Sequence, residues 1–197
     1  LLKAAARTHE AHRGIRFYWH NGDATDVSER LQHGTLDFAV LLQPVDVVRY
    51  DFVSLPDVAR WGALVPVGGE FAGRNVLTAD DLKRVPLAIH HREGLQREFS
   101  LWAGSDTDEF DVSATYNVLN GSPTPFVTSG LGCVVTTDDH LDGDESADVR
   151  FLPLDPPLET RCALVYRRHA ALSKSAAIFL EQVNRSLQSM HEGNGKE

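Results

Sequence analysis

The sequence predicts an α/β fold, and two observations support that prediction. Residues 1–42 alternate between segments with the apolar spacing of a helix and segments with the apolar pattern of a strand, which is the rhythm of βαβ units. Short apolar runs of strand length, such as WGALVPV at 61–67, recur further along the chain between helical segments. With 197 residues and 42% hydrophobic content, the chain can bury a core as one large domain or as two small ones.

The first 42 residues contain four predicted elements. Apolar residues repeat at helical spacing over residues 1–13, and residues 15–20, IRFYWH, alternate as in a strand. Residues 25–34, TDVSERLQHG, predict a second helix, whose final glycine suits the left-handed position after a helix. Residues 36–42, LDFAVLL, form a continuous apolar run, which favours a parallel strand covered on both faces.

The rest of the chain continues this alternation. Thr78 and Asp81 have the spacing of a capping box and predict a short helix. The C-terminal segment predicts a long helix, because its apolar residues from Leu172 to Leu187 lie on one stripe. Further strands are predicted at 61–67, 86–90, 110–118, 132–136, 149–154 and 161–167, and further helices at 95–104 and 122–130.

Composition and charge narrow the classes of function. Lys and Arg number 19 against 28 Asp and Glu, so the net charge is −9 and has the wrong sign for following nucleic-acid phosphates. No apolar run approaches the roughly 18 residues that span a bilayer, and the opening residues lack the pattern of a signal peptide. The chain opens within a helical pattern and without Met, so we expect it to be a piece of a longer protein. Cys133 and Cys162 lie in apolar runs without CxxC spacing, which indicates buried thiols and a cytoplasmic protein.

The sequence offers no familiar metal site. His9 and His12 share a predicted helix face, and His90 and His91 are adjacent, but neither pair has a third ligand at a usual spacing. Adjacent strand residues point to opposite faces, so His90 and His91 converge on one ion only if the strand has already ended. The acidic loop 138–148 departs from the calcium-loop template at its third and last positions. We therefore expect no metal and no other cofactor.

Catalytic motifs are missing as well. The sequence has no GxSxG elbow, and Ser129 in TSGLG has no paired base in view. The segment GLGC at 130–133 lacks the third glycine of a dinucleotide fingerprint and precedes a strand instead of following one. A histidine–carboxylate pair assembled from distant segments stays open, so an enzyme remains an alternative. We expect no catalytic residues.

Several segments together resemble the effector-binding domain of LysR-type transcriptional regulators. LQHGTLDFAV at 31–40 matches the family's "L..G.lDlai" turn, and VTSGLGCVV at 127–135 matches its "V..GlGia" helix-to-strand junction. VLTADDLKRVPL at 76–87 matches the short helix that leads to a strand begun by proline. Residues 151–183 match the closing strands and terminal helix, so the resemblance covers nearly the whole chain.

The resemblance implies a type 2 periplasmic-binding-protein-like architecture, in which two α/β subdomains joined by two crossing strands enclose a ligand cleft. On this sequence, regulatory subdomain I would be residues 1–66 and 159–197, and regulatory subdomain II would be residues 67–158. VPVGG at 65–69 and DPPLE at 155–159 are the natural crossover points. The family also has an N-terminal winged helix-turn-helix, which is absent from this chain.

The predicted site follows from topology. Ligands of open α/β sheets bind beyond the C-terminal ends of the strands, so the loop after the strand 86–90 should face the ligand. Arg92 in that loop offers a bidentate partner for a carboxylate, and the helix start near residue 124 offers the N–H groups of Thr124 and Phe126 to an anion. The residues predicted to bind ligand are Gln43, Pro44, His90, His91, Arg92, Asn120, Gly121, Ser122 and Thr124.

The resemblance and this site together predict a sensor of a small anionic metabolite. Effector binding would change the placement of the two subdomains and so act on the DNA-binding modules of the full-length regulator. The resemblance further implies a homodimer, with a tetramer left open, and the helix 1–13 and the strand 15–19 are the expected interface elements. No membrane partner is expected. The alternative is a periplasmic-type solute-binding protein of a transporter, and an enzyme on the same scaffold comes third.

Overall fold

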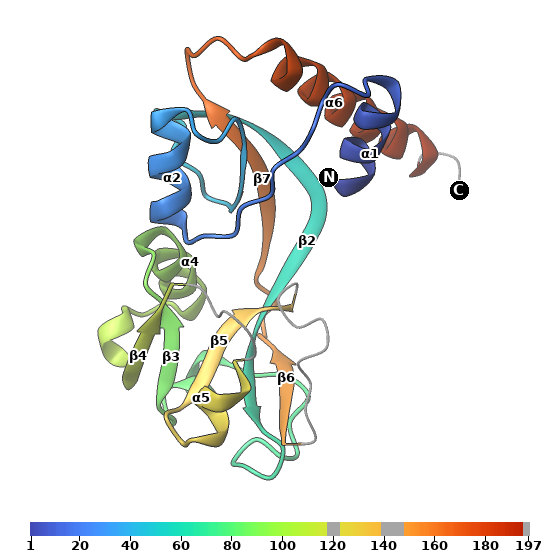
Figure 1. Cartoon of the computed structure of the whole chain (residues 1–197). Coiled ribbons are helices and arrows are strands. Elements are labelled where there is room, and N and C mark those ends of the chain that lie inside the picture. The colour runs from blue at the N-terminus through green and yellow to red at the C-terminus, as the bar shows by residue number, and fades with distance from the viewer. Residues whose placement is uncertain (118–122, 139–147, 195–197) are drawn as a thin grey trace. The chain divides into compact units, whose positions relative to one another are not determined.

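The structure is a computed structural model of the chain, and it describes residues 1–117, 123–138 and 148–194. It divides into two compact units. Unit 1 comprises Leu1–Asp57 and Cys162–Glu197, and unit 2 comprises Val58–Arg161. Two strands, β2 (Tyr50–Pro66) and β7 (Glu159–Arg167), belong partly to each unit (Figure 1). None of the helices in the described ranges is long and apolar enough to cross a membrane.

In unit 1, β1 (Ala39–Leu42) pairs antiparallel with β7, and β7 lies next to β2. The prediction of a parallel strand covered on both faces at 36–42 is therefore wrong. The described sheet ends at β1, where Val40 is 45% exposed. An apolar run reports burial but not the direction of its partner, and the partner here lies more than a hundred residues away.

Helices pack on both faces of this sheet at β7. On one face, α2 (Ala24–His33) packs Val27 and Leu31 against alternate residues of β7. On the other, α1 (Leu2–Ala11) and α6 (Lys174–Asn194) lie side by side (Figure 1) and pack against Leu164 of β7. Gly34 ends α2 with a φ of 72°, as its sequence predicts.

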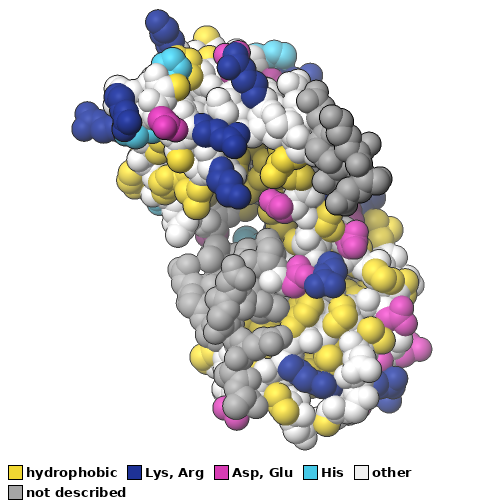
Figure 2. Space-filling view, turned by 90° about the vertical axis from the view of Figure 1, so that its right-hand side faces the viewer, with side chains coloured by type: hydrophobic (Ala, Val, Ile, Leu, Met, Phe, Trp, Pro, Cys, Tyr) yellow, Lys and Arg dark blue, Asp and Glu magenta, His cyan; other side chains and the backbone are white. Residues whose placement is uncertain are grey.

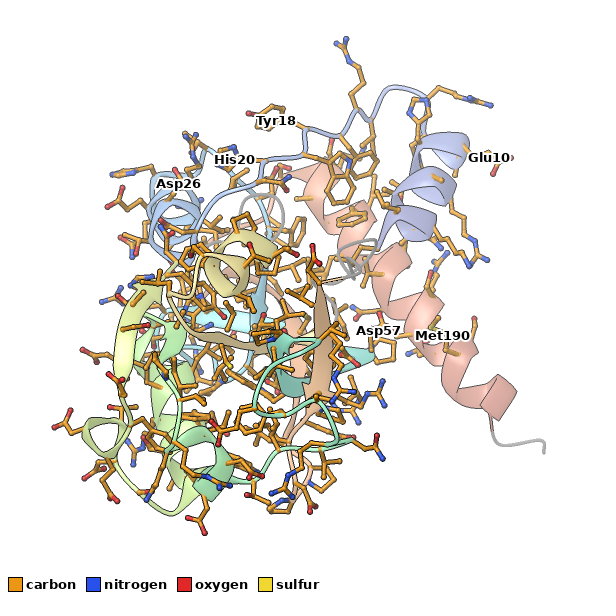
Figure 3. The ribbon with its side chains drawn as sticks, turned by 90° about the horizontal axis from the view of Figure 1, so that it is seen from below. Glu10, Tyr18, His20, Asp26, Asp57 and Met190 are labelled. Atoms are coloured by element: carbon orange, nitrogen blue, oxygen red, sulfur yellow. The ribbon has the colours of Figure 1, made fainter. Side chains whose placement is uncertain are left out.

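The segment 15–20 is not the strand that its alternation predicts. In the described part of the chain no strand pairs with it, and side chains hold it instead. His9 Nδ1 donates to the Ile15 carbonyl over 2.7 Å, and His20 Nε2 lies 2.5 Å from Asp26 Oδ2 (Figure 3). Hydrogen bonds from His20 and Arg30 hold the pKa of Asp26 below its usual value. Alternation alone does not make a strand, because the backbone groups need a ladder partner.

The sheet of unit 2 is mixed. In it, β3 (Leu87–His90) runs parallel to its neighbours β5 (Cys133–Thr137) and β4 (Val112–Tyr116), whereas β2 is antiparallel to β5 and β6 (Val149–Pro153). The connection from β3 to β4 passes through α4 (Glu93–Ala103) and makes a βαβ unit, whereas the βαβ rhythm predicted for residues 1–42 does not form. The shorter helical elements are α3 (Ala79–Leu82), η1 (Thr107–Glu109) and α5 (Thr124–Thr128).

Both faces of this sheet are buried at β3. Leu87 and Ala88 are fully buried and Ile89 is 4% exposed. Val127 of α5 packs on one face with Leu64, and α4 covers the other. The strand predicted at 86–90 is confirmed as β3, which ends at His90.

The predicted capping box begins α3, where the Thr78 side chain accepts from the Asp81 N–H and the Asp81 side chain accepts from the Thr78 N–H.

The glycines of the GLGC segment give a test of this packing. Gly132 has a φ of +146°, and a Cβ there would lie 2.7 Å from the Pro86 carbonyl carbon, whereas Gly130 has a φ of +79° and open space around it. Both Gly→Ala changes meet backbone strain, but only Gly132→Ala also pushes β5 from β3. We expect Gly130→Ala to cost about 1–2 kcal/mol of unfolding free energy and Gly132→Ala about 3 kcal/mol or more. Urea unfolding measures both, and equal losses would contradict the close approach.

Candidate functional site

The candidate site begins where β3 ends. We call residues 90–94 the β3–α4 turn. His90 is the last residue of the strand, and the His91 N–H donates to the Tyr116 carbonyl over 2.8 Å as a final link to β4. Arg92 then takes the N-cap position of α4, with extended backbone angles. The helix starts at Glu93, two residues before its predicted start.

His90 organises this turn through its side chain and its backbone. Its Nδ1 accepts the Arg92 N–H over 3.0 Å, and its carbonyl accepts Gln96 Nε2 over 2.9 Å. A backbone N–H can only donate, so Nδ1 must carry the lone pair and the neutral ring carries its proton on Nε2. The imidazole thus holds the backbone of the N-cap residue Arg92, whereas the N-cap side chain makes no capping hydrogen bond to the first turn of α4.

The two adjacent histidines lie on the same side. Their rings stack with centroids 5.3 Å apart and planes at 24°, because the strand ends at His90 and the alternation of faces ends with it. The Tyr116 ring lies edge-on to the His90 ring, also with centroids 5.3 Å apart. The part of the chain that the structure describes contains no group of three or more His, Cys, Asp or Glu side chains suited to a metal. The expected lack of a metal stays a prediction.

Tyr116, whose ring contacts His90, is an uncharged neighbour of the turn. Its hydroxyl donates to the Val135 carbonyl over 2.6 Å. Burial raises the pKa of Tyr116 to about 12, so the phenol stays protonated at neutral pH. Tyr116 therefore adds no negative charge to the turn.

Arg92 brings the positive charge of the turn. Its side chain is half-buried, and this desolvation lowers the pKa of the guanidinium from its usual value. An arginine still keeps its charge in a protein. The N–H groups of Glu93 and Gly94 lie in the first turn of the 11-residue α4, where no intrahelical acceptor exists. A partly desolvated cation beside such a helix start is chemically suited to an anion.

The other predicted site residues divide between the units. Thr124 begins α5 in unit 2, but the Phe126 N–H, expected to face an anion, already donates to the Pro123 carbonyl over 3.1 Å. Gln43 and Pro44 follow β1 in unit 1, and Gln43 Nε2 donates to Ser54 Oγ over 2.8 Å. The predicted residues Asn120, Gly121 and Ser122 lie outside the described residues.

Sequence reasoning missed the residues behind the turn. A small pocket lies beneath α4, next to His90. The segment WGALVPV predicts only a buried strand, and no local pattern marks one of its side chains as part of a site. The pocket is lined by Trp61, Ile89, His90, Leu95, Gln96, Phe99 and Val135.

Comparisons with solved structures support the fold. The chain is similar to the effector binding domain of QuiR in complex with shikimate, with a TM-score of 0.78 and 12% identity, over 94% of this chain and 88% of that one. It is similar to HinK, a LysR family transcriptional regulator from Pseudomonas aeruginosa, with a TM-score of 0.70 and 19% identity, over 95% of this chain and 65% of that one. It is also similar to the CcmR regulatory domain of Synechocystis in complex with 2-PG, with a TM-score of 0.69 and 14% identity, over 91% and 87%.

These identities are low, so the three likenesses establish the fold. A comparison with curated proteins finds no match. The family model described as LysR substrate binding domain, however, matches residues 1–188. The predicted periplasmic-binding-protein-like α/β fold is therefore confirmed. The chain belongs to the LysR substrate binding domain family, as a LysR-type effector-binding domain.

Proposed function

We propose that this domain senses a small anionic metabolite through the β3–α4 turn and carries out no catalytic step. The observation that supports this most directly is the half-buried charge of Arg92 at the start of an 11-residue helix. The helix start and the guanidinium attract the same sign of charge, and a carboxylate can meet both at once. His91, which is exposed beside Arg92, is a further contact for the same ligand.

Two structural neighbours guide the choice of probe. The QuiR domain is in complex with shikimate, a carboxylic acid, and the CcmR domain is in complex with 2-PG. At 12% and 14% identity, these complexes say nothing about the contacts in this chain. They make shikimate a reasonable first member of a panel of small carboxylates.

We propose further that effector binding is relayed through a change in the placement of two subdomains. We assign residues 1–66 and 159–197 to regulatory subdomain I and residues 67–158 to regulatory subdomain II, with the ligand between them. Gln43 and Pro44 would contribute from subdomain I, and Thr124 with Asn120, Gly121 and Ser122 from subdomain II. An effector shifts the placement of the subdomains only by its difference in affinity between the two states. In the full-length cytoplasmic regulator, this shift would move paired DNA-binding modules.

Ligand binding should depend on Arg92. Titration calorimetry with the first carboxylate that raises the thermal midpoint of the chain measures the dissociation constant. Arg92→Ala should weaken binding roughly ten- to hundredfold, because a charge-assisted hydrogen bond contributes about 1.5–3 kcal/mol. Arg92→Lys should lose less, since it keeps the charge but not the planar fork.

Arg97→Ala is the matched control for this experiment, because Arg97 is exposed on the same helix. It should bind the carboxylate as the wild type does. Equal affinity of the Arg92→Ala variant and the wild type would show that the anion binds elsewhere than at the β3–α4 turn.

The domain should also form a dimer through the N-terminal part of unit 1. Leu2 of α1 and Tyr18 and Trp19 of the following segment are 69%, 76% and 54% exposed. Hydrophobic side chains reach the surface between basic ones in the upper part of Figure 2, which contains α1 and α6. Exposed apolar side chains that gather on one face of a protein indicate an interaction surface.

Sedimentation analysis tests this interface. Tyr18→Asp places a charge in the interface and should shift the dimer toward monomer at concentrations where the wild type is dimeric. Leu101→Asp is the control, because Leu101 is 68% exposed but lies on α4 in unit 2. A dimer weakened by Leu101→Asp and not by Tyr18→Asp would refute the assignment.

A further inference from the structure

The ring of His90 holds the backbone of the β3–α4 turn. Its Nδ1 accepts the Arg92 N–H over 3.0 Å, and the ring contacts those of His91 and Tyr116, each with centroids 5.3 Å apart. Arg92 is the N-cap residue of α4, and its own side chain makes no capping hydrogen bond. The hydrogen bond to His90 Nδ1 therefore fixes the residue from which the helix begins.

This hydrogen bond requires an uncharged ring. A neutral imidazole has one nitrogen that donates and one that accepts, whereas the protonated ring donates from both nitrogens. The Arg92 N–H can only donate, so a proton on His90 Nδ1 would place two donors 3.0 Å apart. A histidine in ordinary surroundings takes up this proton near about pH 6.5. The bond is therefore present at neutral pH and lost once mild acid protonates the ring.

The described groups around His90 favour the same neutral state. The Tyr116 phenol on β4, whose pKa burial raises to about 12, stays uncharged. Within the turn, His91 and the Arg92 guanidinium are basic, and the Glu93 carboxylate is exposed, so solvent and salt screen its attraction for a proton. The side chains from β2, β3, α4 and β5 that line the pocket beside His90 carry no charge: Trp61, Ile89, Leu95, Gln96, Phe99 and Val135.

We propose that His90 is a positioning residue for the anion site of the β3–α4 turn, and that this site is held only while the His90 ring is neutral. The neutral ring fixes the Arg92 backbone, and with it the place of the guanidinium and of the Glu93 and Gly94 N–H groups. A protonated ring has to turn away from the Arg92 N–H and releases the start of α4. This inference rests on the proposed function, but it gives His90 a role through Arg92, whereas His91 is a contact for the ligand.

The ¹⁵N-labelled chain without ligand tests the hydrogen bond first. Long-range ¹H–¹⁵N spectra of the imidazole show which ring nitrogen carries the proton. At about pH 8, well above the usual histidine range, we expect the proton of His90 on Nε2. As the pH is lowered, the amide signal of Arg92 should move with the same midpoint as the protonation of the His90 ring. A proton on Nδ1 at high pH, or an Arg92 signal that does not follow this protonation, would overturn the proposal.

Two variants separate the acceptor from the charge. His90→Asn keeps an acceptor, because its amide oxygen takes about the place of Nδ1, but it takes up no proton. His90→Leu removes the acceptor. In calorimetry at about pH 8 with shikimate, or with the first carboxylate that binds, His90→Asn should bind within about threefold of the wild type. His90→Leu should bind roughly three- to tenfold more weakly, as expected for the loss of one hydrogen bond.

The pH profile shows whether His90 acts through the turn. Between about pH 8 and pH 5.5, the affinity of the wild type should fall about tenfold relative to His90→Asn, as expected for one proton taken up near pH 6.5. Both chains keep His91, so its own titration cancels in this comparison. If His90→Leu fails to fold, the comparison of the wild type with His90→Asn still tests the proposal.

Two results of the pH profile would contradict the proposal. A rise in the affinity of the wild type relative to His90→Asn in acid would show that the charged ring attracts the anion directly. Equal profiles would show that the protonation of His90 does not matter. Failure of every carboxylate to bind would refute the proposed function, whereas an Arg92 amide that ignores the His90 ring would refute the role of His90. The two failures are therefore distinguishable.

Discussion

The burial of β3 is the constraint on which the candidate site depends. Leu87, Ala88 and Ile89 are at most 4% exposed, and parallel strands flank them on both sides. Parallel neighbours bring their C-terminal ends to one edge of the sheet, so a chain that leaves β3 must turn there. His90 Nδ1 then accepts the Arg92 N–H, and α4 begins at the next residue, Glu93. The position of the Arg92 charge follows from these two facts.

The sequence predicts an element well where its signal is local. The end of α2 at Gly34 and the capping box of Thr78 and Asp81 depend on residues within one turn, and both are confirmed. Predictions that depend on distant partners are weaker. The direction of β1 is set by β7, and the segment 15–20 lacks a ladder partner in the described part of the chain.

The long strand β2 shows a different limit. The apolar run predicts a strand only over 61–67, but β2 begins at Tyr50. Its first half contains Pro56, and a proline within a run argues against a strand when the sequence is taken alone. Strand pairing overrides that pattern, and the strand continues from unit 1 into unit 2.

The site shows the same division. Topology predicts that the loop after 86–90 matters, but the roles of its residues come from geometry. His90 Nδ1 and the His90 carbonyl accept hydrogen bonds from Arg92 and Gln96 of the same region. The Phe126 N–H donates to the Pro123 carbonyl. Trp61 and Gln96 could not be predicted, because their pocket is assembled from three strands and a helix. The sequence thus predicts where the charge of Arg92 lies, but it does not predict that Trp61 and Gln96 lie near it.

We infer that a small anion binds at the β3–α4 turn and is released unchanged. The most direct test is a titration of the ¹⁵N-labelled chain, with shikimate first and then the other carboxylates, followed through its backbone amide signals. We expect the largest shifts on the amide signals of Arg92, Glu93 and Gly94, and we expect to recover the acid intact. Largest shifts away from this turn, or conversion of the acid to a product, would contradict it.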